Sequence, residues 1–315
     1  MDIEYLASDG HKEYSIFVGM DRAGKFTKPV RIEHDREAYR SYLRSLPPGL
    51  PIAVEATGFY YWMVDEMEAA GHRPVLTNAG KAKLMMGEVN KTDKLDARGL
   101  VTLLKNGTIP EVWIPTTEVR DERELHRSRM SFTNIRTRIK NRIHASFAKY
   151  LIELPDVSDI FGKKGLAQLR ECAEQLPPET RKSLLQQLEL LAAVEEQMKT
   201  CEKRIKAVIK VDASVRNLMT ITGIGEILAI VISREIGDIT RFPTAEKLAS
   251  YSGVVPRVIS SGGKTRYGRT RFDVNRYLKW SFIEAANSIV RGQRTMEGRY
   301  VLSLYRRLKE KKGYG

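Results

Sequence analysis

Strand and helix signals alternate from Tyr14 to about Pro115, and this alternation restricts the possible folds more than any other feature of the sequence. Short apolar runs bounded by turn residues indicate strands, and amphipathic stretches that end at glycine indicate helices. We expect strands at residues 15–20, 26–32, 51–55 and 74–77, and helices at residues 35–46, 60–70 and 92–106. This order predicts an α/β domain with one mixed sheet.

Four carboxylates stand at the ends of these elements. Asp21 and Glu55 each follow an apolar run, and Asp93 and Asp96 lie three residues apart at the start of a helix, on one helix face. Because strand ends of α/β sheets are favoured ligand sites, we expect the four to form one cluster. Carboxylate oxygens are ligands that Mg²⁺ prefers, and a pair of such ions supports phosphodiester chemistry. The alternative is that these acids are structural, since helix starts favour Asp.

The charge balance favours a polyanionic partner. Lys and Arg number 53 against 39 Asp and Glu, a net charge of +14. Residues 120–151 read as one long basic helix, and we expect it to bind nucleic acid through the release of counterions. The alternative is a solvated helical face. The expected contacts on this helix are Arg127, Arg136, Arg138, Lys140 and Arg142.

A second long helix is expected at residues 179–210. Apolar residues repeat every seven positions along two seams, which is typical of a coiled coil. The first seam is Leu184, Leu191, Met198 and Ile205, and the second is Val194, Cys201 and Val208. The repeat leaves open whether the helix pairs within the chain or between chains, and we expect it to contribute to a homo-oligomer, a dimer or a tetramer.

The last third of the chain is expected to be mainly helical, with two glycine-rich turns. The turn at residues 223–225 precedes an apolar helix and resembles a helix-hairpin-helix turn that presents backbone N–H groups to a phosphate. Simple helix initiation is the alternative. The tract at residues 257–269 combines small residues with Arg257, Lys264, Arg266 and Arg269, so we expect it to bind phosphate. A serine there can act as a nucleophile, or the tract is a flexible basic loop.

These signals divide the chain into three parts: residues 1–115, residues 116–211 and residues 212–315. Cys172 and Cys201 fit no metal-binding or disulfide pattern. The sequence shows no signal peptide and no apolar run long enough to cross a bilayer, so we expect a cytoplasmic protein without a membrane partner.

Several motifs in this order resemble the DEDD transposases of bacterial insertion sequences, a family described as bridge-RNA-guided serine recombinases. The resemblance covers nearly the whole chain. Its N-terminal motifs are Val18-Gly19-Met20-Asp21, Val54-Glu55-Ala56-Thr57-Gly58 and Lys91-Thr92-Asp93-Lys94-Leu95-Asp96-Ala97. Its C-terminal motifs are Thr222-Gly223-Ile224-Gly225, Tyr251-Ser252-Gly253-Val254-Val255-Pro256-Arg257 and Ser260-Ser261-Gly262-Gly263-Lys264-Thr265-Arg266.

The resemblance implies a RuvC-like, RNase H-type fold for the first part and a transposase domain for the last. It implies that Asp21, Glu55, Asp93 and Asp96 bind Mg²⁺, as two ions. It also implies that a serine attacks double-stranded DNA and stays attached to it, under the guidance of a structured RNA. The family keeps this serine directly before a glycine, which indicates Ser261, with Ser260 as the competing position.

Two other functions remain open at this point. The first is a metal-dependent nuclease or Holliday-junction resolvase, in which activated water attacks the phosphate and no serine is needed. The second is a nucleic-acid-binding protein without catalytic activity, whose acids are structural. The tract around Ser261 favours the recombinase over the first, and a requirement for Mg²⁺ separates both enzymes from the second.

Overall fold

The structure is a computed structural model that describes residues 2–86, 93–271, 273–292 and 299–313; for residues 93–95, 299 and 312 only the backbone is described. The chain divides into two compact units, Met1–Ile114 (unit 1) and Pro115–Gly315 (unit 2). Unit 2 therefore contains both regions that the sequence analysis separates at residue 211.

Unit 1 is an α/β domain. Its elements are β1 (Tyr5–Gly10), β2 (Tyr14–Met20), β3 (Val30–Glu33), α1 (Arg36–Arg44), β4 (Pro51–Glu55), α2 (Tyr60–Ala69), β5 (Arg73–Thr77), α3 (Ala79–Met86) and α4 (Asp93–Lys105). The strands form one mixed sheet in the order β3-β2-β1-β4-β5. β1 pairs antiparallel with β2 and parallel with β4, and β4 pairs parallel with β5. The predicted mixed sheet is confirmed.

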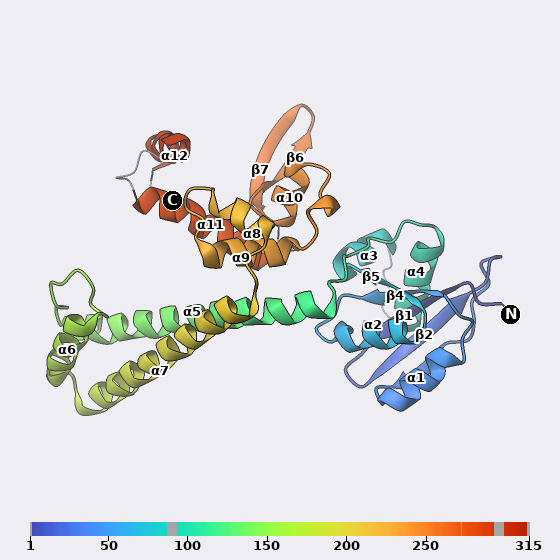
Figure 1. Ribbon diagram of the computed structural model, residues 1–315, viewed down its shortest axis with the longest axis horizontal. Coiled ribbons are helices and arrows are strands. Elements are labelled where there is room, and N and C mark those ends of the chain that lie inside the picture. Colours follow the sequence, from blue (N-terminus) through green and yellow to red (C-terminus); the bar gives the residue numbers. More distant parts are fainter. Residues whose placement is uncertain (1, 87–92, 272, 293–298, 314–315) are drawn as a thin grey trace. The chain divides into compact units, whose positions relative to one another are not determined.

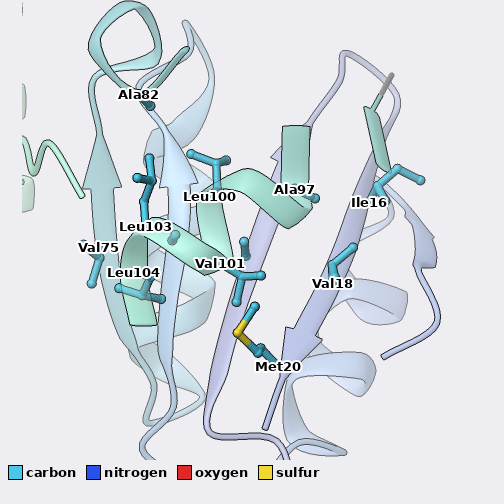
Figure 2. Packing of buried hydrophobic residues seen from close by; sticks show 12 residues of the cluster. Ile16, Val18, Met20, Val75, Ala82, Ala97, Leu100, Val101, Leu103 and Leu104 are labelled. Carbon is cyan, nitrogen blue, oxygen red and sulfur yellow. The ribbon is translucent and has the colours of Figure 1, made fainter. Parts of the chain in front are cut away.

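Two apolar layers sandwich this sheet. Figure 2 shows α4 on one face, where Leu100, Val101 and Leu104 pack against strand residues that include Val18 and Val75. Helices α1 and α2 cover the opposite face and bury a second apolar cluster. Strand residues alternate between the two clusters, as the two-residue period of a strand requires.

One strand of this sheet is missing from the prediction, and another begins later than predicted. The missing strand is β1, the central strand, because the first predicted strand begins at residue 15. The strand predicted at residues 26–32 does return beside β2, but as β3 at Val30–Glu33, and Phe26 forms only an isolated bridge with Met20. The omission of β1 changes which strand ends come together, because β1 pairs with β4.

Unit 2 is mainly helical. Its elements are α5 (Thr117–Ala148), α6 (Lys163–Cys172), η1 (Ala173–Gln175), α7 (Pro178–Val208), α8 (Ala213–Met219), α9 (Glu226–Ile236), η2 (Ile239–Arg241), α10 (Ala245–Tyr251), β6 (Pro256–Ser261), β7 (Lys264–Thr270), α11 (Arg276–Arg291) and α12 (Arg299–Lys312). The two long predicted helices are confirmed as α5 and α7. The tract at residues 257–269 forms the hairpin β6–β7, which the sequence analysis does not predict.

Helices α5 and α7 form an antiparallel hairpin and run side by side in Figure 1. Arg129 pairs with Glu202, and Lys140, further along α5, pairs with Glu195, which lies earlier on α7. The seam residues Leu184, Leu191, Val194 and Met198 of α7 are buried in a cluster with Ile139, Ile143 and Phe147 of α5. Cys201 is half-buried and Val208 is exposed.

The predicted apolar seam therefore packs within the chain. Four of the seam residues are thus buried against α5, while Val208 stays exposed. Association of two chains through this helix, and a supercoiled geometry, stay predictions.

Neighbouring leucines of α7 provide a matched test of this packing. Leu191 is 2% exposed and Leu190 is 51% exposed. We expect Leu191→Ala to lower the free energy of unfolding by about 2–5 kcal/mol, because it leaves a cavity in the hairpin core. Leu190→Ala should change it by about 0.5 kcal/mol or less. Urea denaturation followed by circular dichroism measures both, and equal losses would contradict the described packing.

Candidate active site and nucleic-acid interface

Asp9 and Glu55 are neighbours at one edge of the unit 1 sheet. In the parallel pair β1–β4, Ala7 lies opposite Ala53 and Ser8 opposite Val54, so the next positions along the two strands are Asp9 and Glu55. Ala7 and Ala53 both belong to the cluster that faces α4. Because side chains two residues apart in a strand point to the same face, Asp9 and Glu55 also face the α4 side.

Asp21 lies at the other end of the sheet. β2 is antiparallel to β1, with Met20 opposite Tyr5, so Asp21 follows the strand near the start of β1. At about 3.3 Å per residue, that is about 17 Å along the sheet from Asp9. Asp21 instead belongs to a tight turn, in which its carboxylate accepts a hydrogen bond from the Lys25 N–H at 2.9 Å. The prediction that Asp21 joins Glu55 in one cluster is wrong.

Asp9 is the residue that the sequence analysis missed. It is 7% exposed, and His11 Nε2 lies 3.1 Å from its Oδ2. The available signal was the short run Tyr5-Leu6-Ala7-Ser8, which ends in an acid followed by glycine. This run is less apolar than residues 16–20, so the pattern predicts the neighbouring strand as the first.

Helix α4 brings the second pair of acids toward the same edge. Ala97 lies at the Ile16 end of β2 in Figure 2, and Val101 lies nearer Met20. Ile16 is the antiparallel partner of Asp9, so the start of α4 lies at the edge that holds Asp9. Asp96 is half-buried there. Asp93 is the first residue of α4, and its side chain lies outside the described residues.

These acids form a set of hard oxygen donors. Among the side chains that the structure describes, no three His, Cys, Asp or Glu are close enough together to hold a metal ion. The pair Asp9 and Glu55, with Asp96 on the facing helix, nevertheless has the chemistry that Mg²⁺ or Mn²⁺ prefers, since all its donors are carboxylates.

The hairpin β6–β7 presents the two candidate serines on opposite faces. Ser261 pairs across the hairpin with Lys264, and Ser260 pairs with Thr265. Directly opposed residues share a face and adjacent residues do not, so Ser261 lies on the face of Lys264 and Arg266. Ser260 lies on the other face, with its Oγ 3.4 Å from that of Thr265.

A tight turn places Ser261 next to the tip of this hairpin. Gly262 and Gly263 have φ of 55° and 75°, and positive φ at both central residues is what a two-residue type I′ turn needs. Every residue of β6 is exposed. Residues 256–270 contain no Asp or Glu, so the hairpin has a wholly positive charge.

Comparison with known proteins decides the family. Residues 7–152 match a DEDD transposase domain of the IS110 type, and residues 215–301 match the model described as "Transposase IS116/IS110/IS902 family". Together the two matches span most of the chain. The chain belongs to the IS110/IS116/IS902 family of transposases. It is therefore an enzyme of DNA transposition that binds DNA, and unit 1 is its RNase H-like DEDD domain.

Several curated relatives are similar over most of their length. A probable family 20 transposase of Pseudomonas aeruginosa is 26% identical over 296 residues, 92% of this chain and 85% of the relative. The transposase for insertion sequence element IS1111A of Coxiella burnetii is 26% identical over 84% of this chain and 71% of its own length. The transposase for IS1328 of Yersinia enterocolitica is 24% identical over 75% and 69%.

Membership in this family implies a divalent metal for the DEDD domain. The described helices of the transposase include none long and apolar enough to span a membrane.

A buried carboxylate in unit 2 takes up part of the predicted basic surface. Glu235 of α9 is fully buried and accepts hydrogen bonds from Arg127 Nε and Nη2 at 2.8 and 2.9 Å. His126 Nε2 lies 2.8 Å away, and Asn275 Nδ2 donates at 2.7 Å. Arg123 donates to the backbone carbonyls of Arg234 and Glu235. Arg127 therefore has a structural partner, although it was expected to contact nucleic acid.

The same network supports the base of the hairpin. Asn275 caps α11 by accepting from the N–H groups of Tyr277 and Leu278, while its amide holds Glu235. Lys279 of α11 donates to the Thr270 hydroxyl at 2.8 Å, at the end of β7. Glu235 thus connects α5 and α9 to the helix that anchors the hairpin.

The remaining basic candidates on α5 differ in their surroundings. Lys140 lies 3.5 Å from Glu195 and its ammonium lies 4.6 Å from the Phe161 ring. Arg138 and Arg142 are exposed and Arg136 is half-buried, and within the described part of the chain none of these three pairs with a carboxylate. They are the members of the predicted set most available to a phosphate.

The turn at residues 223–225 packs tightly. Gly223 has φ of 88°, and a Cβ there would meet the Ala285 carbonyl oxygen at 2.5 Å. The Ile224 N–H donates to the Ile221 carbonyl. Close packing on α11 thus explains this glycine, and a helix-hairpin-helix role stays a prediction.

We predict that Glu235→Gln destabilises unit 2 by about 3–5 kcal/mol, because it leaves buried arginine charge without a carboxylate. Glu202→Gln is the control: Glu202 is 39% exposed and pairs with Arg129, so its loss should cost about 1 kcal/mol or less. Urea denaturation at neutral pH compares them. Equal effects would contradict the central role of Glu235.

The pKa of Glu235 adds a pH dependence. Burial alone would raise this pKa, but hydrogen bonds from His126 and Arg127 and the charges of Arg127 and Arg123 outweigh it and hold the pKa well below its usual range. The unfolded chain therefore takes up the proton first as the pH falls. The stabilisation is complete above about pH 4.5, the ordinary range of a glutamate, and is lost progressively below it. Stability of Glu235→Gln should fall less steeply than that of the wild type over this range.

Proposed function

We propose that this transposase cuts and exchanges DNA strands through a covalent bond between Ser261 and a DNA phosphate. The observation that supports it most strongly is the hairpin β6–β7, which presents Ser261 beside its tip on the same face as Lys264 and Arg266. A serine in these surroundings can approach a phosphate, and the two cations balance the charge of the phosphate oxygens.

The chemistry is a pair of phosphoryl transfers. The Ser261 Oγ attacks phosphorus, the bond from phosphorus to one deoxyribose oxygen breaks, and the hydroxyl proton leaves to solvent as the departing oxygen takes one up. The hydroxyl of an exchanged strand then attacks the phosphoserine and releases Ser261. Each step replaces one phosphodiester bond with another, so rejoining needs no nucleotide cofactor.

We assign the metal site to Asp9, Glu55, Asp93 and Asp96, in place of the set that includes Asp21. The support is the pairing of β1 with β4, and the position of α4 on the face to which both strand carboxylates point. When bound, Mg²⁺, as two ions, stabilises the charge that develops on the phosphate and the leaving oxygen. The carboxylates would hold the ions through their oxygens. The same phosphate must also reach Ser261, which belongs either to the same chain as the metal site or to a second chain.

Nucleic acid is proposed to bind along two positive surfaces. One is the exposed part of α5 with Arg136, Arg138 and Arg142. The other is the hairpin with Arg257, Lys264, Arg266 and Arg269. Double-stranded DNA and a structured guide RNA both present the phosphates that such surfaces attract. Support for the RNA is the net charge of +14 together with the family resemblance. A homo-oligomer is proposed for the strand exchange itself, which joins two DNA molecules.

Asp9→Asn and Asp21→Asn test the metal assignment as a matched pair. Both remove one negative charge from unit 1. We expect Asp9→Asn to abolish strand cleavage in Mg²⁺ and to remove the rise in melting temperature on addition of Mn²⁺, because a ligand is lost. Asp21→Asn should keep the rate of strand cleavage and the Mn²⁺-induced rise in melting temperature within about twofold of the wild-type values. Its only other effect should be a small loss of stability in the turn that contains it. Cleavage by Asp9→Asn at the wild-type rate would refute the assignment.

Ser261→Ala and Ser260→Ala test the nucleophile. Ser261→Ala loses the attacking oxygen but no charge, so it should bind DNA normally and form no covalent adduct. Ser260→Ala should retain the adduct, since its hydroxyl faces Thr265 on the other side of the hairpin. Denaturing gels with labelled DNA detect the adduct, and mass spectrometry of the digested adduct locates it. If the double variant Ser260→Ala with Ser261→Ala still cut DNA but formed no covalent adduct, the result would favour a nuclease that activates water.

A further inference from the structure

An open pocket of about 390 Å³ lies in unit 1, beside the proposed metal edge. Its lining combines aromatic rings with cations: Lys12, His34, Arg36, Phe59 and Trp62. Lys12 lies three residues after Asp9, in the turn from β1 to β2, and Phe59 lies four residues after Glu55, just before α2. The pocket therefore lies at the same end of the strands as the two carboxylates, but on the opposite face of the sheet, where Phe59 and Trp62 pack with α1 and α2.

The aromatic wall is held in place by hydrogen bonds and ring contacts. The His34 ring centroid lies 4.9 Å from that of Trp62 and 5.8 Å from that of Phe59. His34 Nδ1 donates to the Lys12 carbonyl at 3.2 Å, since a carbonyl only accepts, and His34 Nε2 lies 2.8 Å from the Ser15 hydroxyl. Trp62 also contacts Tyr39, whose side chain is fully buried. A wall fixed in this way is ready to stack against a flat ring.

The two cations are available at the mouth of the pocket. Lys12 and Arg36 are both exposed. An oxygen of the Glu66 carboxylate lies 3.9 Å from the Arg36 guanidinium. Both oxygens of that carboxylate accept hydrogen bonds from Arg40, at 2.6 and 2.9 Å, so Arg40 is its main partner. The lining contains no Asp or Glu, so the pocket favours an anionic ligand. A ligand with a flat aromatic part and a negative charge fits both features.

We propose that this pocket binds one unpaired nucleotide of the nucleic acid on which the transposase acts. The base stacks against Trp62 and Phe59, and the phosphate lies between Lys12 and Arg36. Stacking on aromatic side chains beside a basic surface is how proteins hold single strands without reading their sequence. A nucleotide held here keeps the strand unpaired at the edge where the metal carboxylates lie. The proposal goes beyond the catalytic assignments, because binding at this pocket needs neither Ser261 nor a metal.

Single-strand binding by the full chain tests the proposal in the presence of a chelator, where no catalysis takes place. The probes are fluorescent seven-nucleotide DNA and RNA strands of one sequence, together with a DNA duplex of the same length. The double variant Lys12→Ala with Arg36→Ala removes two exposed charges, so it should fold normally. Its matched control, Lys28→Ala with Arg44→Ala, removes two exposed charges of unit 1 away from the pocket.

We expect the pocket variant to bind an unpaired strand about tenfold more weakly, with less than about a twofold change for the duplex. The control pair should weaken both probes equally and slightly. A loss confined to DNA or to RNA supports the pocket and identifies the strand that occupies it. The proposal is overturned if the pocket variant and the control pair bind both single strands equally well.

Trp62→Leu provides a second readout that does not depend on charge. A probe with 2-aminopurine in place of one adenine should show quenched fluorescence on binding to the wild type, because the base stacks on Trp62. The quenching should disappear in Trp62→Leu and persist in Phe26→Leu, which removes an exposed ring near the opposite sheet edge. Circular dichroism confirms that both variants are folded, and equal quenching in the two would overturn the stacking arrangement.

Discussion

The parallel pairing of β1 with β4 determines where the chemistry of unit 1 takes place. Because the two strands run in the same direction and in register, their last residues, Asp9 and Glu55, lie side by side. The two-residue period turns both carboxylates toward the face that α4 covers, and α4 begins at that same edge with Asp93 and Asp96. The opposite face belongs to α1 and α2, and the proposed nucleotide pocket lies at the start of these two helices, with Arg36 and Trp62 in them and His34 and Phe59 just before them.

Unit 2 depends on a different kind of interaction. A buried carboxylate there accepts hydrogen bonds from side chains of several helices. Glu235 is surrounded by Arg127, His126 and Asn275, which come from α5 and the start of α11. Burial of a charge is costly unless it is paired, so the network favours one arrangement of these helices. That arrangement supports the hairpin with Ser261, whose own strands are exposed on both faces and make a weak unit in isolation.

Sequence periodicity predicted the long elements well and the short ones poorly. The heptad repeat of residues 184–205 and the charges of residues 123–142 extend over many turns, so α5 and α7 were predicted. Their pairing with each other was not predicted.

The strand before Glu55 was also predicted, because its apolar run is uninterrupted. β1 is short and contains Ser8, and its omission led to Asp21 in place of Asp9. Register between strands is a long-range property that one strand's pattern does not contain. The glycine pair at residues 262–263 is a hairpin signal between β-forming residues, but it was interpreted as a phosphate-binding loop.

The proposed metal site lies at the carboxyl ends of β1 and β4. Anomalous scattering from manganese, recorded on crystals of the transposase soaked in Mn²⁺, would locate the ions. We expect a manganese peak about 2–2.6 Å from a carboxylate oxygen of Asp9 and of Glu55. A peak bound by Asp21, with Asp9 and Glu55 free of metal, would contradict it.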